Sequence, residues 1–257
     1  MSPPNLFSKT SKHVVAIFHA NPIELVVEGS PNCIKRRQGS LSLIKYRGHC
    51  FGITNQHVIE EATRRQHTFY VALEKHRPVP GRLLFQSTQA NPDLSFDLAV
   101  FLLDEEAIRS GNKNPVDLER SFECLSEGDQ ALAVGFPGTE QRMENLVQMS
   151  HGLYHVVAQC HCASDRKIIL QEQLTPPDNQ VIRFGGMSGG AIFRLTNADS
   201  YSFSGVVFEG RGFDDRCADD PSQTDSHRSD QIWIYGFPFG PKDLELALDI
   251  FQPNLRL

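Results

Sequence analysis

Short apolar runs, separated by glycine, proline, asparagine and aspartate, follow one another along most of the 257-residue chain. Runs of this length with turn residues between them are typical of strands in all-β sandwiches and barrels. Some alternate with a period of two, so that Phe69, Val71 and Leu73 fall on one face of a strand. We therefore predict an all-β fold of about a dozen strands. The predicted strands are His13–Phe18, Ile23–Val27, Leu41–Tyr46, Cys50–Ile53, Thr68–Leu73, Leu83–Phe85, Leu98–Leu103, Ala131–Phe136, Leu153–Ala158, Lys167–Leu170, Gly190–Leu195 and Phe203–Phe208.

One helix is predicted near the C-terminal end of the chain. Pro241 suits a first helical position, because an N–H group there has no partner within the helix. The apolar residues that follow recur at helical spacing, and Pro253 closes the segment; they are Leu244, Ala247, Leu248 and Phe251. This pattern predicts a helix over about residues 241–252, and a shorter helical turn is expected after His57.

Polar stretches divide the chain. Asp104–Glu127 is mostly polar and contains Gly111-Asn-Lys-Asn-Pro115, which indicates a linker between two halves, with room for a helical turn. Gly210–Asp230 is rich in aspartate, serine and arginine, and we predict a mobile surface loop there. Residues 1–12 are expected to form a flexible N-terminal tail.

Composition narrows the functional classes. Hydrophobic residues make up 40% of the chain and charged residues 22%, as in ordinary globular proteins. The net charge of −6 argues against nucleic-acid binding, which favours a basic face. The six cysteines are sparse, the N-terminus lacks the apolar core of a signal peptide, and no apolar run is long enough to span a membrane. We expect a cytoplasmic protein with reduced thiols and no membrane partner.

The most informative motif is Gly185-Gly-Met-Ser-Gly-Gly190, which lies between two apolar runs. Glycines on both sides of Ser188 permit backbone conformations that other residues avoid and let a substrate approach closely. Such a turn can aim two N–H groups at one point and form an oxyanion hole. The alternative is a tight glycine turn between strands in which Ser188 has no chemical role.

A nucleophilic serine needs a base, and the base needs an acid that orients it. His57 stands out among the ten histidines because it ends an apolar strand, although a histidine in that place is often structural or merely exposed. Asp97 lies at the start of a strongly apolar strand, where a carboxylate needs a partner. Asp93 and Asp104 flank the same strand and are read as ordinary turn or strand-end acids.

Four blocks in this order resemble the chymotrypsin-like peptidases, and most closely their HtrA-type and bacterial relatives. The blocks are Ile53-Thr-Asn-Gln-His-Val58 around the base, Asp97-Leu-Ala-Val100 around the acid, Gly128-Asp-Gln-Ala-Leu-Ala-Val-Gly-Phe-Pro-Gly138 at the start of the second half, and Gly186-Met-Ser-Gly-Gly190 at the nucleophile. The likeness extends from about Val14 to Phe208, and no PDZ-sized domain follows it. It implies two six-stranded antiparallel β-barrels, at about residues 13–110 and 120–240, with the site in the cleft between them.

The resemblance also implies roles for individual residues. Ser188 attacks the scissile carbonyl, His57 takes and returns the proton, and Asp97 fixes the tautomer of the histidine. The N–H groups of Gly186 and Ser188 form the oxyanion hole. No cofactor is implied, and the implied substrate is a protein or peptide.

Three positions depart from the secreted members of the family. Met187 stands where those enzymes carry the aspartate that receives a new N-terminus, so activation by N-terminal cleavage is not expected. Val58 occupies the position of the cysteine that would pair with Cys50. Ile182 stands where trypsin-type enzymes carry an aspartate, which implies an uncharged or small primary pocket.

The strand Gly205-Val-Val-Phe-Glu209 is expected to pair with substrate through its main chain and to line the pocket with Val206, Val207 and Phe208. Phe208 is expected to narrow this pocket. Two interpretations of Glu209 stay open, since it can attract a basic side chain or lie in solvent at a loop edge.

The sequence also allows other functional interpretations. A catalytically silent double barrel that binds peptides is the first alternative to a serine endopeptidase, although simple binding does not need all three residues in these contexts. A hydrolase of non-peptide esters is disfavoured, because α/β-hydrolases place the serine first in the chain.

Cys160-His-Cys162 resembles a metal site. Alternate strand residues share a face, so Cys160 and Cys162 lie on one face and His161 lies on the other, and no metal is expected. A regulatory protein partner that orders the loop Gly210–Asp230 is a further expectation.

Overall fold

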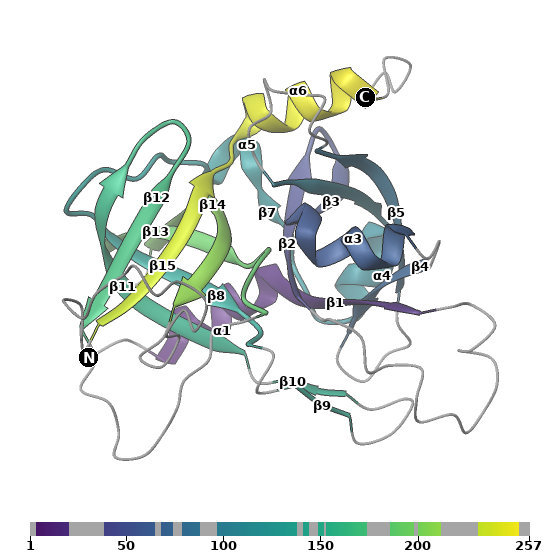
Figure 1. The fold of residues 1–257 in the computed structure, drawn as a ribbon, viewed down its shortest axis with the longest axis horizontal. Helices are drawn as coiled ribbons and strands as arrows, with labels where there is room; N and C mark the ends of the chain where they lie inside the picture. Colours follow the sequence, from purple (N-terminus) through teal and green to yellow (C-terminus); the bar gives the residue numbers. More distant parts are fainter. Residues whose placement is uncertain are drawn as a thin grey trace, which may run out of the picture.

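Two groups of antiparallel strands, each closed on itself, make up the molecule (Figure 1). The computed structural model describes residues 4–20, 39–64, 68–73, 79–87, 97–137, 141–143, 149–151, 153–173, 186–197, 200–211 and 231–251. The predicted all-β fold with two six-stranded barrels and a C-terminal helix is confirmed.

The first barrel has the strand order β1-β4-β5-β6-β3-β2, and pairing of β1 with β2 closes it. A short strand, β7 (Val116–Asp117), adds to β2 in parallel. Apolar residues at alternate positions face inward, where the helices α3 (Gln56–Arg64) and α4 (Glu105–Ser110) also contribute Ile59 and Ile108 to the packed interior. The strands are β1 (Val14–Ala20), β2 (Gly39–Tyr46), β3 (His49–Thr54), β4 (Thr68–Ala72), β5 (Val79–Gln86) and β6 (Ala99–Leu103).

The second barrel has the order β11-β12-β15-β14-β13-β8 and is also closed. Its interior holds Met187, from the turn before β13, among the side chains of Ile192 and Val207. A separate two-stranded ribbon joins β9 (Gln141–Met143) to β10 (Met149–His151). The barrel strands are β8 (Gln130–Gly135), β11 (Tyr154–Ala163), β12 (Ile168–Gln173), β13 (Ala191–Asn197), β14 (Ser200–Arg211) and β15 (Gln231–Pro238).

Most predicted strands agree with observed ones within a few residues, whereas one lies outside the described residues and four observed strands, β7, β9, β10 and β15, were not predicted. Ile23–Val27 lies outside the described residues. β15 was not predicted, although its alternation of buried Ile234 with half-buried Trp233 and Tyr235 is a strand signal of the ordinary kind.

A third apolar cluster lies between the barrels and joins them to the C-terminal helix. The helix α6 (Pro241–Phe251) begins at the predicted proline and buries Leu244, Ala247 and Leu248 in this cluster. Glu245, on the same helix, accepts hydrogen bonds from the Tyr46 hydroxyl and the Arg47 guanidinium, both at 2.5 Å. The helix is thereby held to the first barrel by packing and by polar contacts.

The prediction of a flexible tail over residues 1–12 is wrong for the residues that the structure describes. Residues 4–13 form α1 (Pro4–Thr10) and the short helix η1 (Ser11–His13). Leu6 is only 3% exposed and belongs to the cluster between the barrels, and the ring of Phe7 lies 4.7 Å from that of His155. Burial of these two side chains offsets the conformational entropy that a short helix loses on ordering.

The predicted linker Asp104–Glu127 is folded against the barrels. Asp104 caps α4 (Glu105–Ser110) by accepting the N–H groups of Glu106 and Ala107 at 2.9 and 3.2 Å, so it has the structural role expected of it. A second short helix, α5 (Leu118–Ser121), buries Leu118. Of the predicted loop Gly210–Asp230, the first two residues belong to β14, and residues 212–230 lie outside the described residues.

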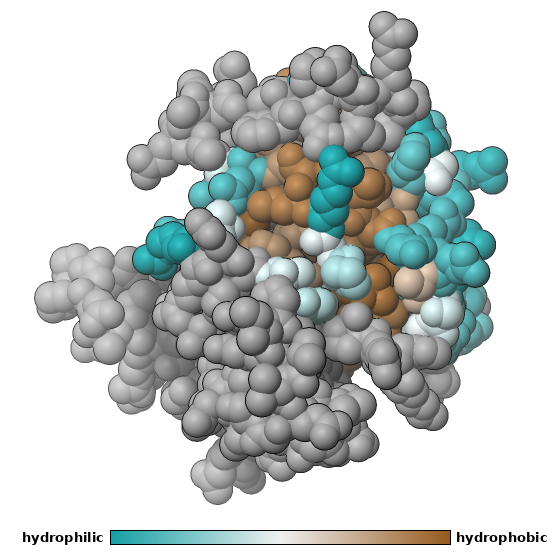
Figure 2. All heavy atoms as spheres, turned by 90° about the vertical axis from the view of Figure 1, so that its right-hand side faces the viewer, coloured by the Kyte–Doolittle hydropathy of each residue, from teal (hydrophilic) through white to brown (hydrophobic). Residues whose placement is uncertain are grey.

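The outer side of the first barrel carries some apolar surface. Ala72 on β4 and Leu102 on β6 are half-buried there. Figure 2, which turns this side of the molecule toward the viewer, shows apolar residues gathered at the centre of the face, with hydrophilic residues bordering them. None of the described helices is long and apolar enough to cross a membrane.

Candidate active site

His57 lies at the junction between the first barrel and a helix. The strand β3 ends at Thr54, and α3 (Gln56–Arg64) begins two residues later, so the predicted helical turn after the strand is confirmed. Ile59 is fully buried and anchors α3 in the barrel, whereas the side chain of His57 is 44% exposed. The imidazole is therefore accessible on a short helix whose opposite side is fixed.

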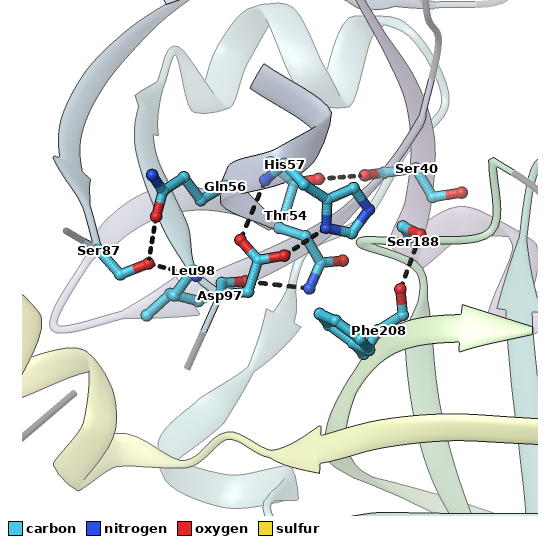
Figure 3. Close-up of polar contacts among 10 residues, drawn as sticks. Ser40, Thr54, Gln56, His57, Ser87, Asp97, Leu98, Ser188 and Phe208 are labelled. Atoms are coloured by element: carbon cyan, nitrogen blue, oxygen red, sulfur yellow. Dashed lines mark hydrogen bonds and ion pairs between the residues drawn. The ribbon is translucent and has the colours of Figure 1, made fainter. Parts of the chain in front are cut away.

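Asp97 contacts both the backbone and the ring of His57 (Figure 3). Its Oδ1 accepts the main-chain N–H of His57 at 3.0 Å, and its Oδ2 is hydrogen-bonded to Nδ1 of the ring. The Asn55 side chain donates to the carbonyl oxygen of Asp97 at 3.0 Å. Because a carboxylate can only accept, the ring proton belongs on Nδ1, and Nε2 keeps a free lone pair.

The segment that leads from Asp97 into β6 is supported by Ser87, a residue that was not predicted from the sequence. Ser87 accepts the N–H of Leu98 at 3.0 Å, and its hydroxyl donates to the side chain of Gln56 at 2.8 Å. This contact joins the residue after Asp97 to the residue before His57. The sequence carries no signal for it, because the partners lie on three separate elements.

Ser188 lies in a turn that requires glycine. Gly186 has φ +101° and Gly189 has φ +88°, conformations that L side chains rarely adopt. A Cβ atom at Gly189 would also lie 2.1 Å from the carbonyl oxygen of Ser40, so no other residue fits there. The glycines of the motif are thus explained by backbone conformation and by close approach to the first barrel.

The hydroxyl of Ser188 donates a 2.7 Å hydrogen bond to the carbonyl oxygen of Phe208. The ring of Phe208 contacts the ring of His57 edge-on, with the centroids 5.6 Å apart. The structure therefore brings Ser188, His57 and Asp97 together around Phe208. In this conformation the hydroxyl donates to Phe208, and it must turn from that carbonyl before it can donate to His57.

Two N–H groups of the turn are open to a ligand. The N–H groups of Gly186 and Ser188 have no acceptor among the residues that the structure describes. The carbonyl groups of residues 186–189, by contrast, all accept hydrogen bonds. Paired carbonyls and unpaired N–H groups are the arrangement that can bind a negatively charged oxygen.

The predicted substrate-binding residues divide into three cases. Ile182 lies outside the described residues. Val206 and Val207 are 0% exposed, and both main-chain groups of Val207 are bonded to the nucleophile turn, at 2.9 Å to Gly189 and 2.7 Å to Gly190. Their side chains pack into two apolar cores, and contact of Val206 and Val207 with a substrate stays a prediction. Phe208, at 38% exposure, is accessible.

The cysteines show no sign of a shared site. Cys50, Cys124, Cys160 and Cys162 are free, and burial raises the pKa of the Cys50 thiol to about 12 and that of Cys160 to about 11. His161 is exposed on the opposite face from buried Cys160. In the described part of the chain, no three histidine, cysteine or acidic side chains are grouped to hold a metal ion.

The chain is similar to known peptidases in sequence pattern and in structure. A family model described as a trypsin-like peptidase domain matches residues 42–198. The chain is also similar in structure to a thermostable serine protease, AL20, from an extremophilic microorganism, with 14% identity and a TM-score of 0.53. That match covers 95% of this chain and 99% of the other, and at this identity it bears on the fold alone. No curated protein sequence matches the chain.

Proposed function

Because the chain belongs to the family of trypsin-like peptidase domains, we propose that it is a serine endopeptidase whose catalytic residues are Ser188, His57 and Asp97. The observation that carries this proposal is the double contact of Asp97 with the backbone and ring of His57, next to a serine in a glycine-shaped turn. A histidine oriented in this way is a base ready to accept a proton at Nε2.

The proposed reaction begins when the Ser188 hydroxyl turns from Phe208 toward His57. As Oγ attacks the carbonyl carbon of the substrate, its proton passes to Nε2, and Asp97 stabilises the imidazolium that forms. The new oxyanion accepts hydrogen bonds from the N–H groups of Gly186 and Ser188. The proton then moves to the leaving amine, and water releases the acyl group from Ser188 by the same steps.

An extended peptide is the proposed substrate, held along β14. The strand β13 pairs with β14 only as far as Val206, whereas β15 pairs with it as far as Arg211. We propose that an extended peptide adds to β14 by main-chain hydrogen bonds, beyond the point where its pairing with β13 ends. The exposed ring of Phe208 provides an apolar contact beside His57 for a substrate side chain.

A fluorophosphonate probe, which reacts with activated serines, tests the proposal. The full chain is expected to be labelled and to cleave casein, and Ser188→Ala is expected to lose both properties. Ser200→Ala, which removes an exposed serine from the same barrel, is the matched control and is expected to behave as wild type. Failure of the folded wild-type chain to react, or labelling that survives in Ser188→Ala, would contradict the proposed function.

A further inference from the structure

The turn that carries Ser188 is held from the first barrel by a buried serine. Ser40, the second residue of β2, is 0% exposed. Its hydroxyl donates to the carbonyl oxygen of Gly186 at 2.9 Å and accepts the N–H of Phe136 at 2.8 Å. One side chain thus bonds two main-chain groups, one on each side of the contact between the barrels.

Ser40 provides two of the hydrogen bonds that hold the turn. The carbonyl of Met187 accepts the N–H of Gly190 at 2.8 Å, which is a contact within the turn. The carbonyl of Ser188 accepts the main-chain N–H of Ser40 at 2.9 Å. The carbonyl of Gly189 accepts the Ser42 hydroxyl at 2.9 Å. Ser40 therefore holds the turn on both sides of Met187, and Gly186 depends on its side chain.

The peptide between Gly186 and Met187 has few other constraints. A glycine with φ +101° can rotate more freely than any other residue, and the buried side chain of Met187 packs in the second barrel without a polar group to bond the turn. Because peptide groups are planar, fixing the carbonyl oxygen of Gly186 fixes the whole plane. That plane lies between the peptide that carries the N–H of Gly186 and the peptide that carries the N–H of Ser188, so its orientation affects the angle between these two groups.

We propose that Ser40 is a positioning residue for the oxyanion hole. Its hydroxyl sets the Gly186–Met187 peptide so that the two N–H groups converge on one point. The inference rests on the proposed function, because it assigns the two groups to a developing oxyanion. Loss of the hydroxyl is expected to lower kcat by roughly 10²-fold, the effect of losing one oxyanion donor, and to leave KM within about threefold.

The test compares three variants with the wild-type chain. Ser40→Ala removes the hydroxyl, and Ser40→Cys keeps nearly the same volume with a much weaker donor. Ser42→Ala is the matched control, because Ser42 is equally buried on the same strand but bonds the turn at Gly189. Measured quantities are kcat and KM for a peptide substrate, thermal unfolding, and hydrogen–deuterium exchange of peptides containing Phe136 and residues 186–190.

Ser40→Cys is expected to lose kcat as Ser40→Ala does, to unfold cooperatively, and to exchange faster at Phe136 and the turn, while Ser42→Ala keeps most of its kcat. A folded Ser40→Cys protein with wild-type kcat would overturn the inference, as would an equal loss of kcat in Ser42→Ala. An inactive wild-type chain would contradict the proposed function instead. Hydrogen exchange would then decide the role of Ser40, because unchanged exchange in both Ser40 variants means that the hydroxyl does not hold the turn.

Discussion

Replacement of Asp97 by asparagine is expected to preserve the shape of the site and to place the ring proton of His57 on the wrong nitrogen. The carboxylate now accepts two hydrogen bonds from His57, one from the main-chain N–H and one from Nδ1. An amide has one accepting oxygen and one donating NH₂ group, so it can satisfy only one of these donors.

The expected loss in kcat follows from the two orientations that the amide in Asp97→Asn can adopt. With its oxygen on the main-chain N–H, the NH₂ group faces Nδ1, which must then accept, and the proton moves to Nε2. The opposite orientation keeps the reactive tautomer but sets two donors against each other, at a cost of about 1–3 kcal/mol. The charge that stabilises the imidazolium is lost as well, which adds roughly 1.5–3 kcal/mol. Together these effects predict a loss of about 10²- to 10⁴-fold in kcat.

The assay is the second-order rate of fluorophosphonate labelling, supported by kcat on a peptide substrate. Asp104→Asn is the matched control, because Asp104 follows the same strand and also accepts main-chain N–H groups, but as a helix cap. It is expected to keep the wild-type rate. If Asp97→Asn labels within tenfold of the wild-type rate, Asp97 does not set the tautomer of His57 and the proposed assignment fails.

Three other changes have defined outcomes. Gly189→Ala is expected to destabilise the fold by roughly 3 kcal/mol or more, because the new Cβ atom strains the backbone and clashes with Ser40. Gly128 also has a positive φ but lies in open space, so Gly128→Ala is expected to destabilise the fold by only about 1–2 kcal/mol. Thermal unfolding of the two variants measures this difference. Burial lowers the pKa of His13 from 6.5 to about 4, so the unfolded chain binds this proton first as the pH falls. Its contribution to stability is complete above pH 6.5 and decreases by roughly 3 kcal/mol toward pH 4, a loss that urea titrations should find in the wild type and not in His13→Gln. Phe208→Ala is expected to raise KM about fivefold for peptides with apolar side chains near the cleaved bond, since roughly 1 kcal/mol of apolar burial is lost, and an unchanged KM would exclude this contact.

Local patterns in the sequence were enough to predict most strands, the C-terminal helix and the residues of the candidate site. Apolar periodicity reports which face of an element is buried, and α6 buries the residues that its spacing indicates. The glycines around Ser188 reflect backbone conformations that depend mainly on the residue itself, and Gly186 and Gly189 do have positive φ. The resemblance added the order of His57, Asp97 and Ser188, which periodicity alone does not supply.

The sequence also contains signals for features that were not predicted. Ser40 and Ser42 alternate with leucines on β2, and two polar residues on one face of an otherwise apolar strand need buried partners. The alternation of buried and half-buried residues in β15 is likewise a strand signal that the sequence contains. Leu6 and Phe7 in the N-terminal stretch are apolar enough to pack, although nothing nearby indicates which surface receives them.

Contacts between residues far apart in the chain depend on how the two barrels pack together. Ser40 and Gly186 are 146 residues apart, and their hydrogen bond exists because the edge of one closed barrel lies against a turn of the other. The burial of Val206 and Val207 has the same origin, since their strand separates the interior of the second barrel from the core between the barrels. The residues that can carry the chemistry are identifiable from the sequence alone, because side-chain type and backbone freedom are local properties. The packing of two barrels determined where their hydrogen-bonding groups point, because direction is set by partners that no local pattern identifies.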